Sequence, residues 1–209
     1  DGTTWTAANS GTSGTLYELR DVDFYDANIG IATGSNSTVI RTTDAGATWQ
    51  SMNSGIGASM ESVCVIDPNT ACIVGASSSI GRYEIPPALV VEEGWTLDVA
   101  VSGHYLFLAN MWEGIDAIDM SDPENPVRVG GYSIPYPEAA TDLFVSGNYL
   151  YSVDTQGLMR VIDFTDLSSP VLFGSCAMPV DPVGVAVAGD IAVVADGSAG
   201  LKLVRAAVP

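Results

Sequence analysis

The chain has 209 residues, with 7 Lys or Arg against 25 Asp or Glu, so its formal net charge is −18. This charge excludes a protein that binds the phosphate backbone of nucleic acid, because such binding requires clustered Lys and Arg. Disorder is excluded as well, since 47% of the residues are hydrophobic and only 15% are charged. No apolar run approaches the roughly 18 to 20 residues of a transmembrane helix, so we expect no membrane insertion.

The first half of the chain contains two related units. Residues 19–49 are echoed by residues 61–83, with Asp26 aligned to Asp67 at a spacing of 41 (67 − 26). In both units, short runs of alternating or β-branched residues are broken by Gly, Asn, Asp or Pro, which is the pattern of an antiparallel β-meander. This half therefore predicts two four-stranded sheets.

Two cysteines of the second unit bear on the compartment of the protein. Cys64 and Cys72 lie in two β-rich runs separated by Asp67-Pro68-Asn69, which predicts directly opposed strand positions. The two sulfurs would then be placed for a cross-strand disulfide, and a pair of small buried thiols is the alternative, with Cys176 left over. The scarcity of Lys and such a bridge together favour an exported protein.

The second half repeats with a longer period. Residues 96–132 match residues 141–175, with Asp98 aligned to Asp142 at a spacing of 44 (142 − 98). A third copy at residues 183–204 stops after its third strand-like run. Fixed periods of this length are typical of repeat architectures in which each unit buries its faces against its neighbours.

Five such units predict an all-β fold, a five-bladed β-propeller of four-stranded antiparallel blades in a single domain, residues 1–209. The last unit lacks its outer strand, and the N-terminal segment aligns through Trp5 with Trp49 at the end of the first unit. We therefore expect this segment to supply the missing strand and close the ring. The predicted blades are residues 16–60, 61–95, 96–140, 141–182, and 183–209 together with 1–15. A piece of a larger propeller is the alternative.

The motif TTDAGATW, residues 42–49, resembles the Asp-box of BNR repeats. Residues 1–85 as a whole resemble the BNR repeats of photosystem II assembly and stability factors and their bacterial secreted relatives. The match is carried by Asp44, Gly46, Thr48 and Trp49. The resemblance implies that the box is a structural hairpin, in which the Asp accepts turn hydrogen bonds and the Trp packs between sheets. It implies a fold and gives little evidence of catalysis.

Residues 96–204 resemble LVIVD-type repeats. The resemblance is carried by LDVAVSG, by GIDAIDMSDPENPVRVGGY, and by the Asp and Pro of the shorter turn DLSSP. Proteins with these repeats are mostly bacterial surface or secreted propellers of unassigned role. The resemblance therefore implies a fold, and it implies an extracellular or periplasmic location more than any activity.

The face that carries the loops between second and third strands is the first candidate site. An acidic, aromatic-dotted surface there suits a calcium ion or a sugar stacked on Trp112 or Tyr136, because carboxylates accept bonds from sugar hydroxyl groups. The alternative is that these acids only keep the protein soluble. The candidate binding residues on this face are Trp95, Trp112, Glu113, Tyr136, Glu138, Asp154 and Asp196.

The starts of the innermost strands form the second candidate site, with Asp21, Asp98 and Asp142 predicted near the axis of the ring. Carboxylates that converge in this way can act as acid and base in glycoside hydrolysis. However, residues that recur in register usually make the same structural hydrogen bond in every blade. We therefore predict no catalytic residue, and the single histidine, His104, leaves little material for a catalytic triad.

These observations favour a non-catalytic secreted or cell-surface propeller that acts as a protein-binding or assembly module. The expected partner is another protein or a second copy of the chain, with no resident cofactor except for the calcium ion considered above. A lectin-like glycan-binding propeller is the first alternative. A carboxylate-dependent glycoside hydrolase is the second.

Overall fold

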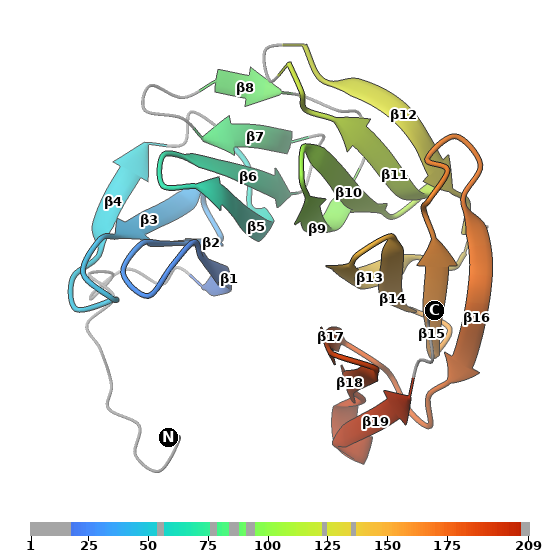
Figure 1. Ribbon diagram of the computed structural model, residues 1–209. Helices are drawn as coiled ribbons and strands as arrows, with labels where there is room; N and C mark the ends of the chain where they lie inside the picture. Colours follow the sequence, from blue (N-terminus) through green and yellow to red (C-terminus); the bar gives the residue numbers. More distant parts are fainter. Residues whose placement is uncertain are drawn as a thin grey trace. The chain divides into compact units, whose positions relative to one another are not determined.

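The computed structural model describes residues 18–53, 57–75, 79–83, 88–90, 95–122, 125–134 and 137–205. Over these ranges the chain is built of β-strands, with one short 3-10 turn, η1 (Gly197–Ala199) (Figure 1). The chain divides into two compact units, residues 1–91 and 92–209, which we call unit 1 and unit 2. The predicted all-β class is confirmed.

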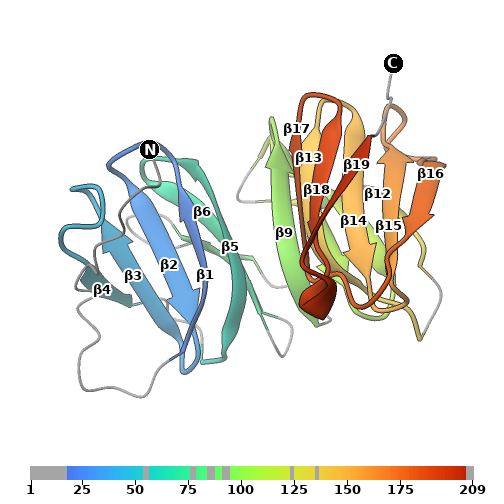
Figure 2. The same ribbon diagram turned by 90° about the horizontal axis from the view of Figure 1, so that it is seen from below.

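Unit 1 contains two four-stranded antiparallel sheets, each a meander in chain order (Figure 2). The strands of the first sheet are β1 (Leu19–Phe24), β2 (Gly30–Gly34), β3 (Thr38–Thr42) and β4 (Gln50–Asn53). The strands of the second are β5 (Met60–Asp67), β6 (Thr70–Gly75), β7 (Ser79–Tyr83) and β8 (Ala88–Val90).

The two sheets of unit 1 pack face to face through the apolar residues of their inner strands. Ile31 of β2 and Val39 of β3 are buried in one cluster with Met60 and Val63 of β5. The middle strands β2 and β6 are buried at every position, so they consist of small and apolar residues without polar alternation.

Unit 2 contains two more four-stranded meanders and a three-stranded sheet. The strands of the first sheet are β9 (Thr96–Ser102), β10 (Tyr105–Asn110), β11 (Gly114–Asp119) and β12 (Val127–Tyr132). Those of the second are β13 (Ala140–Ser146), β14 (Tyr149–Asp154), β15 (Leu158–Asp163) and β16 (Val171–Ala177). Those of the third are β17 (Gly184–Ala188), β18 (Ile191–Ala195) and β19 (Leu201–Arg205).

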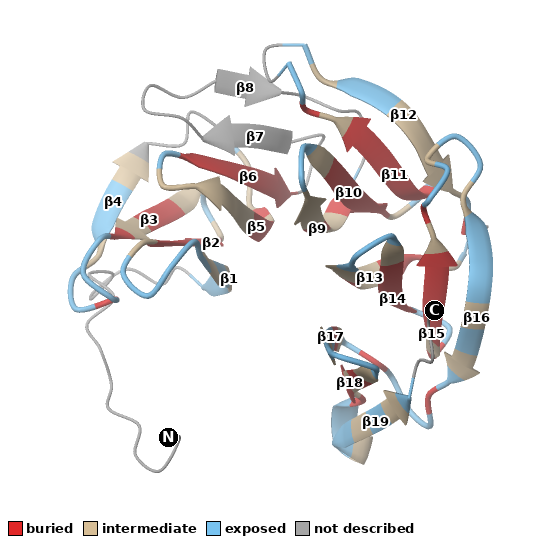
Figure 3. Ribbon diagram, in the orientation of Figure 1, coloured by how far each residue is buried: buried red, intermediate tan, exposed pale blue. Residues whose placement is uncertain are grey.

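The sheets of unit 2 repeat the same register at the 44-residue spacing. Tyr105 pairs with Asp119 in the first sheet as Tyr149 pairs with Asp163 in the second. The second strand of each sheet, β10 and β14, is largely buried, whereas the outer strand β16 is largely exposed and β12 is exposed or half-buried (Figure 3). The middle strands thus carry the core, and the outer strands meet solvent.

The count of complete blades differs from the prediction. Four sheets have four strands, and the fifth, β17–β19, has three strands among the described residues. The predicted fourth strand, from residues 3–8, lies outside the described residues, so closure of the last blade stays a prediction. The single-domain arrangement of residues 1–209 stays a prediction as well. In the described parts of the chain, no helix is long and apolar enough to span a bilayer.

The structure places Cys64 and Cys72 as direct register partners on β5 and β6, as the spacing predicted. Both residues are thiols in this structure, and no disulfide joins them. Burial raises the pKa of the Cys72 thiol to about 12, because the thiolate would have to form in an apolar environment. The opposed positions agree with the predicted register, and the disulfide itself stays a prediction.

Candidate functional site

The predicted axial aspartates join neighbouring sheets. In unit 2 the Asp98 carboxylate accepts a bond of 2.7 Å from the backbone N–H of Leu143, in the next sheet. Asp142 accepts an equivalent bond of 2.7 Å from Val185, one sheet further on. A carboxylate that accepts backbone N–H bonds forms a strong, charge-assisted contact. These aspartates thus recur because each fixes the innermost strand of the following sheet.

Unit 1 contains the same contact between its two sheets. Asp21 Oδ2 accepts bonds from Val63 N at 2.8 Å and from the Ser62 hydroxyl at 2.9 Å. Two residues along the strand, Asp23 Oδ2 accepts a bond of 2.7 Å from Val65 N. The sequence analysis singled out Asp21 and did not single out Asp23, and the sheet-to-sheet bonds give both a structural role.

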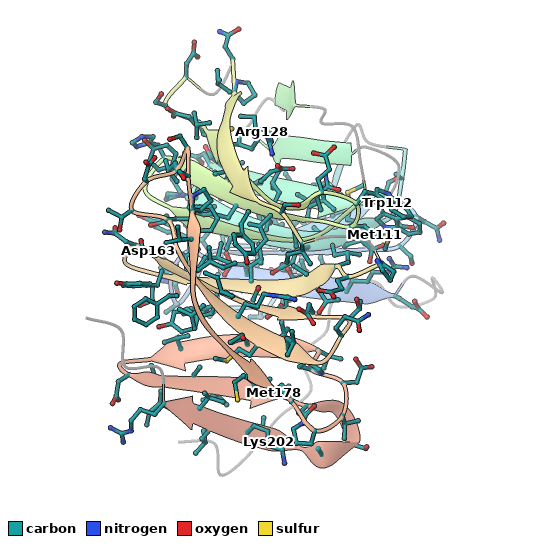
Figure 4. The ribbon with its side chains drawn as sticks, turned by 90° about the vertical axis from the view of Figure 1, so that its right-hand side faces the viewer. Met111, Trp112, Arg128, Asp163, Met178 and Lys202 are labelled. Carbon is teal, nitrogen blue, oxygen red and sulfur yellow. The ribbon has the colours of Figure 1, made fainter. Side chains whose placement is uncertain are left out.

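The candidate binding residues lie toward one end of the strands of unit 2. We call this end the loop rim, defined by loops 111–113, 155–157 and 196–200. The opposite end, with the tight turns at 102–105 and 146–149, is the turn rim. Figure 4 shows Trp112 at the loop rim and Asp163 at the turn rim, at opposite ends of the sheets.

One pair of predicted aromatic residues is brought together at the loop rim. The backbone N–H of Met111 donates to the carbonyl of Trp95 at 2.9 Å, which joins the β10–β11 loop to the segment before β9. Trp95, Trp112 and Glu113 are all exposed. The remaining predicted aromatic residue, Tyr136, lies outside the described residues. Of the predicted sugar site, the structure thus joins the two segments that carry Trp95 and Trp112 by a backbone hydrogen bond.

Two predicted acids of the loop rim form an ion network with Arg160. Asp154 is fully buried, and its Oδ2 accepts a bond from Arg160 Nη1, while Oδ1 accepts the backbone N–H groups of Gln156 at 2.9 Å and Leu158 at 3.0 Å. Glu138 Oε2 accepts a bond of 2.7 Å from Arg160 Nη2. Asp154 is therefore a buried structural anion and does not lie on the surface as predicted.

Asp196 has the same place in the last sheet and is also fully buried, contrary to the expectation that it lies on the surface. Its Oδ1 accepts the backbone N–H groups of Val180 at 3.2 Å and Asp181 at 2.9 Å. Its Oδ2 has no hydrogen-bond partner among the described residues. Lys202, which has the register position of Arg160, instead donates to the carbonyl of Ala199 at 3.0 Å. Both acids are buried because their oxygens satisfy loop N–H groups that water does not reach.

The TTDAGATW segment folds as a compact turn after β3. Asp44 accepts bonds from the backbone N–H of Thr48 at 2.8 Å and from its hydroxyl at 2.6 Å. These bonds hold the pKa of Asp44 below its ordinary value. Gly46 has a φ of +82°, a conformation that favours glycine, and Trp49 packs edge-on against Phe24 with ring centroids 6.0 Å apart. The contacts are those of a structural hairpin.

The outer strand β16 is an uncharged sheet edge. Val171, Leu172 and Phe173 are all exposed, at 57%, 45% and 48%. The corresponding outer strand β12 carries Arg128 at the position of Leu172, and Arg128 donates a bond of 2.6 Å to the buried Asp116. Sheet edges that remain unpaired usually carry charged residues or proline, and β16 carries neither in Val171–Ala177.

The described residues contain no group of three or more His, Cys, Asp or Glu side chains placed to hold a metal ion. Of the carboxylates considered for calcium, Asp154, Glu138 and Asp196 accept the bonds given above, and Glu113 is exposed. Chemically, the site therefore consists of structural anions, two exposed tryptophans and an apolar sheet edge. The sequence did not single out this edge, although the run VLFGSC contains no charge and could have indicated it.

Comparison with known proteins agrees with this architecture. Residues 93–133 and 138–178 each match the family model of the LVIVD repeat. No curated protein matches the chain. The hairpin at residues 42–49 lies outside the two matched segments.

Solved structures with the same fold include three of different origin. The computationally designed Ika8 protein matches with a TM-score of 0.70 at 15% identity, over 92% of this chain and 60% of that chain. The β-propeller domain of Cps50 (Swd1) from Myceliophteria thermophila matches with a TM-score of 0.71 at 12% identity, over 88% and 64%. YCF48 from Cyanidioschyzon merolae matches with a TM-score of 0.69 at 14% identity, over 94% and 69%.

At these identities the likeness concerns the fold alone, and this chain spans less than two thirds of the length of the first two structures. The fold and the sheet-to-sheet contacts define an all-β protein of the β-propeller class. Within that class, the two complete sheets of unit 2 are LVIVD repeats.

Proposed function

We propose that this chain is a non-catalytic β-propeller module that binds a protein partner, outside the cell or at its surface. The observation that carries the proposal is the outer strand β16, an unpaired sheet edge with three consecutive exposed apolar residues. Successive strand residues point to opposite faces, so apolar side chains are exposed on both faces of this edge. A sheet edge can also bind a partner by adding one of its strands through main-chain hydrogen bonds.

The non-catalytic part of the proposal is supported by the contacts of the axial aspartates. Asp21, Asp98 and Asp142 each accept a bond of 2.7 to 2.8 Å from a backbone N–H of the neighbouring sheet. A general acid or base must instead exchange a proton with a substrate. The proposal includes no cofactor and no calcium ion. The scarcity of Lys in the sequence supports the extracellular or periplasmic location.

A lectin is the second candidate function, because Trp95 and Trp112 are both exposed and lie on segments joined by a backbone hydrogen bond. An aromatic ring of this kind can stack on the apolar face of a sugar. In the equivalent loops, however, the residues are Gln156 and Ser198. A lectin propeller commonly repeats its aromatic pocket, so the single cluster favours the protein-binding function.

The edge-strand proposal predicts a specific pair of results. We expect the double substitution Val171→Lys with Leu172→Arg to abolish partner binding, because charges on an edge strand oppose strand addition and remove the apolar contact. Val127→Lys on β12 is the matched control, since Val127 has the same register position and a similar exposure of 56%. Because the substituted positions are exposed, the free energy of unfolding of both variants should stay within about 0.5 kcal/mol of that of the parent chain.

The measurement has two arms. Peptides are selected from a displayed library of random twelve-residue sequences, and their dissociation constants are then measured with the parent chain and both variants. In parallel, the parent chain is tested on a glycan array with and without calcium. Peptides that bind the parent and the Val127 variant but not the double variant support the proposal. Binding to a single class of sugar without any peptide would replace the proposal with a lectin.

We also propose that the N-terminal segment completes the last blade as a fifth propeller blade. This is supported by β19, which has no strand beyond it among the described residues and carries Leu201 and Leu203, each 72% exposed. The turn geometry at Asp44 supports in addition a BNR-type origin for the first half. If residues 3–8 pair with Leu201–Val204, the β19 amides should exchange hydrogen slowly, and deleting residues 1–8 should speed their exchange at least tenfold. Equal rates with and without the segment would disprove this closure.

A further inference from the structure

The turn rim of unit 2 contains a pocket that is not lined by any of the predicted site residues. Its volume is about 230 Å³, and it lies where the β9–β10 turn, the β13–β14 turn and the segment after β15 meet. Its lining includes Tyr105, Phe107, Asn148, Phe164, Thr165 and Leu167. The pocket belongs entirely to unit 2 and is formed by two successive LVIVD repeats.

The floor of the pocket is apolar and fixed. Phe107 and Phe164 are both buried and meet edge-to-face, with ring centroids 5.0 Å apart. The backbone N–H of Phe164 donates to the carbonyl of Asn148 at 2.9 Å, which holds the segment after β15 against the β13–β14 turn. A pre-formed apolar pocket can bind an apolar group without first ordering its own walls.

The size of the pocket limits what it can hold. Pockets for drug-sized molecules have volumes of roughly 300–1,000 Å³, and the volume of about 230 Å³ lies below that range. It suits a single large apolar or aromatic side chain. The polar side chains of the lining are Ser102, Tyr105, Asn148, Tyr149 and Thr165. The buried floor formed by Phe107 and Phe164 is apolar and favours an apolar group at the bottom of the pocket.

The surroundings of the pocket are acidic. Asp119 and Asp163 are the register partners of Tyr105 and Tyr149, and Asp166 follows one residue after Thr165. Hydrogen bonds from the backbone N–H and hydroxyl of Ser121 hold the pKa of Asp119 below its ordinary value, and the hydroxyl and N–H of Thr165 do the same for Asp163.

The Ser168 hydroxyl and backbone N–H likewise lower the pKa of Asp166. The three carboxylates are therefore ionised at neutral pH. His104 lies beside one of them, with its Nε2 3.9 Å from Asp119 Oδ1.

We propose that this pocket holds one large apolar side chain of an extended polypeptide segment, and that Lys or Arg residues flank that side chain and meet the three carboxylates. The inference rests on the proposed function and adds to it a second contact for the same partner. Tyr149 of the pocket lining packs against Phe173 of β16 with ring centroids 5.3 Å apart, so the pocket adjoins the β16 edge. The charge complementarity is reinforced by the net charge of −18 of the whole chain, which attracts basic segments and repels acidic ones.

The test uses Thr165→Trp, which places an indole at the mouth of the pocket. Ser121→Trp is the matched control, since Ser121 has the same position in the preceding repeat and lies outside this pocket. It removes the hydroxyl bond to Asp119 just as Thr165→Trp removes the hydroxyl bond to Asp163, so the two variants differ in whether an indole fills the pocket. Both residues are exposed, so both variants should unfold at the same denaturant concentration as the parent chain. The probes are twelve-residue peptides selected from the random library on the parent chain.

We expect the selected peptides to share a Phe, Leu, Trp or Met with Lys or Arg within three residues. Thr165→Trp should raise their dissociation constants at least tenfold, and Ser121→Trp less than twofold. Replacing the anchoring residue of the peptide by Ala, or its Lys residues by Glu, should each weaken binding at least tenfold. The binding should also weaken at high salt.

Three results would overturn the inference. The first is that the selected peptides bind the Thr165→Trp variant as tightly as the parent chain. The second is that the selected peptides do not share the apolar residue flanked by Lys or Arg. The third is that no peptide is enriched on the parent chain. If the peptides bind the Thr165→Trp variant with unchanged dissociation constants but do not bind the β16 double variant, this pocket is rejected and the proposed function is retained. If the parent chain binds sugars on the glycan array and no peptide, both this inference and the proposed function are rejected.

Discussion

Replacing Arg160 by Met is expected to cost about 3–5 kcal/mol of the free energy of unfolding, because it leaves a fully buried carboxylate without its cation. Asp154 is completely shielded from solvent and Arg160 is 8% exposed, so neither charge is hydrated in the folded state. The methionine side chain has a similar length and keeps most of the packing. The loss therefore reports the unpaired charge of Asp154, and it is measured by urea unfolding followed by circular dichroism.

Two companion variants separate this charge effect from packing. Asp154→Asn in the Arg160→Met background should recover most of the stability, since an amide oxygen can still accept the N–H groups of Gln156 and Leu158 without carrying a charge. Glu138→Gln alone should cost at most about 1 kcal/mol, because Glu138 is partly exposed and its pair with Arg160 is screened by solvent. If the double variant is no more stable than Arg160→Met, the loss comes from packing and not from the buried charge.

This ion network also shows what the sequence could not predict. Arg160 recurs with Arg41 and Arg82 in the third strand of a repeat, which indicates a structural residue. Its partners lie 6 and 22 residues away, and the burial of Asp154 arises only when the loop, the strand and the preceding linker come together. From the sequence alone, an aspartate in a loop is predicted to be exposed to solvent.

The fold, by contrast, could be predicted from the repeats. Strand positions follow from alternation, and the 44-residue spacing places Asp98 and Asp142 at equivalent positions whose shared hydrogen bond joins successive sheets. Local sequence patterns predict the strands here because each sheet packs against its neighbours in the same way. The pocket at the turn rim was not predictable, because its floor combines Phe107 with Phe164 from two different repeats and depends on how closely those repeats approach.

Gly130→Ala is expected to have the second large effect, at or above the upper end of the roughly 1–3 kcal/mol that overpacking costs. A Cβ at Gly130 on β12 would lie 1.6 Å from the carbonyl oxygen of Leu167 and 2.6 Å from its carbonyl carbon. Both are backbone atoms, so no side-chain rotation relieves the clash. Either β12 must leave its pairing with β11, or the segment around Leu167 must move outward.

The repeat supplies a matched control for this substitution. Gly174 on β16 has the same register position, paired with Val161 as Gly130 is paired with Ala117, and a Cβ there would meet no atom within 4 Å. Gly174→Ala should therefore change the unfolding free energy by less than about 0.5 kcal/mol. Similar losses of unfolding free energy at the two positions would show that the effect comes from replacing any glycine of an outer strand by alanine, and not from the contact with Leu167.

The same pair of variants connects stability to binding, because Leu167 lines the pocket at the turn rim. If Gly130→Ala pushes the Leu167 segment outward, the pocket opens and the selected peptides should bind at least tenfold more weakly at temperatures where the variant is still folded. Gly174→Ala should leave their dissociation constants unchanged. Peptide affinity that survives Gly130→Ala would mean that the clash is absorbed by β12 instead, and hydrogen exchange at the β12 amides would then rise.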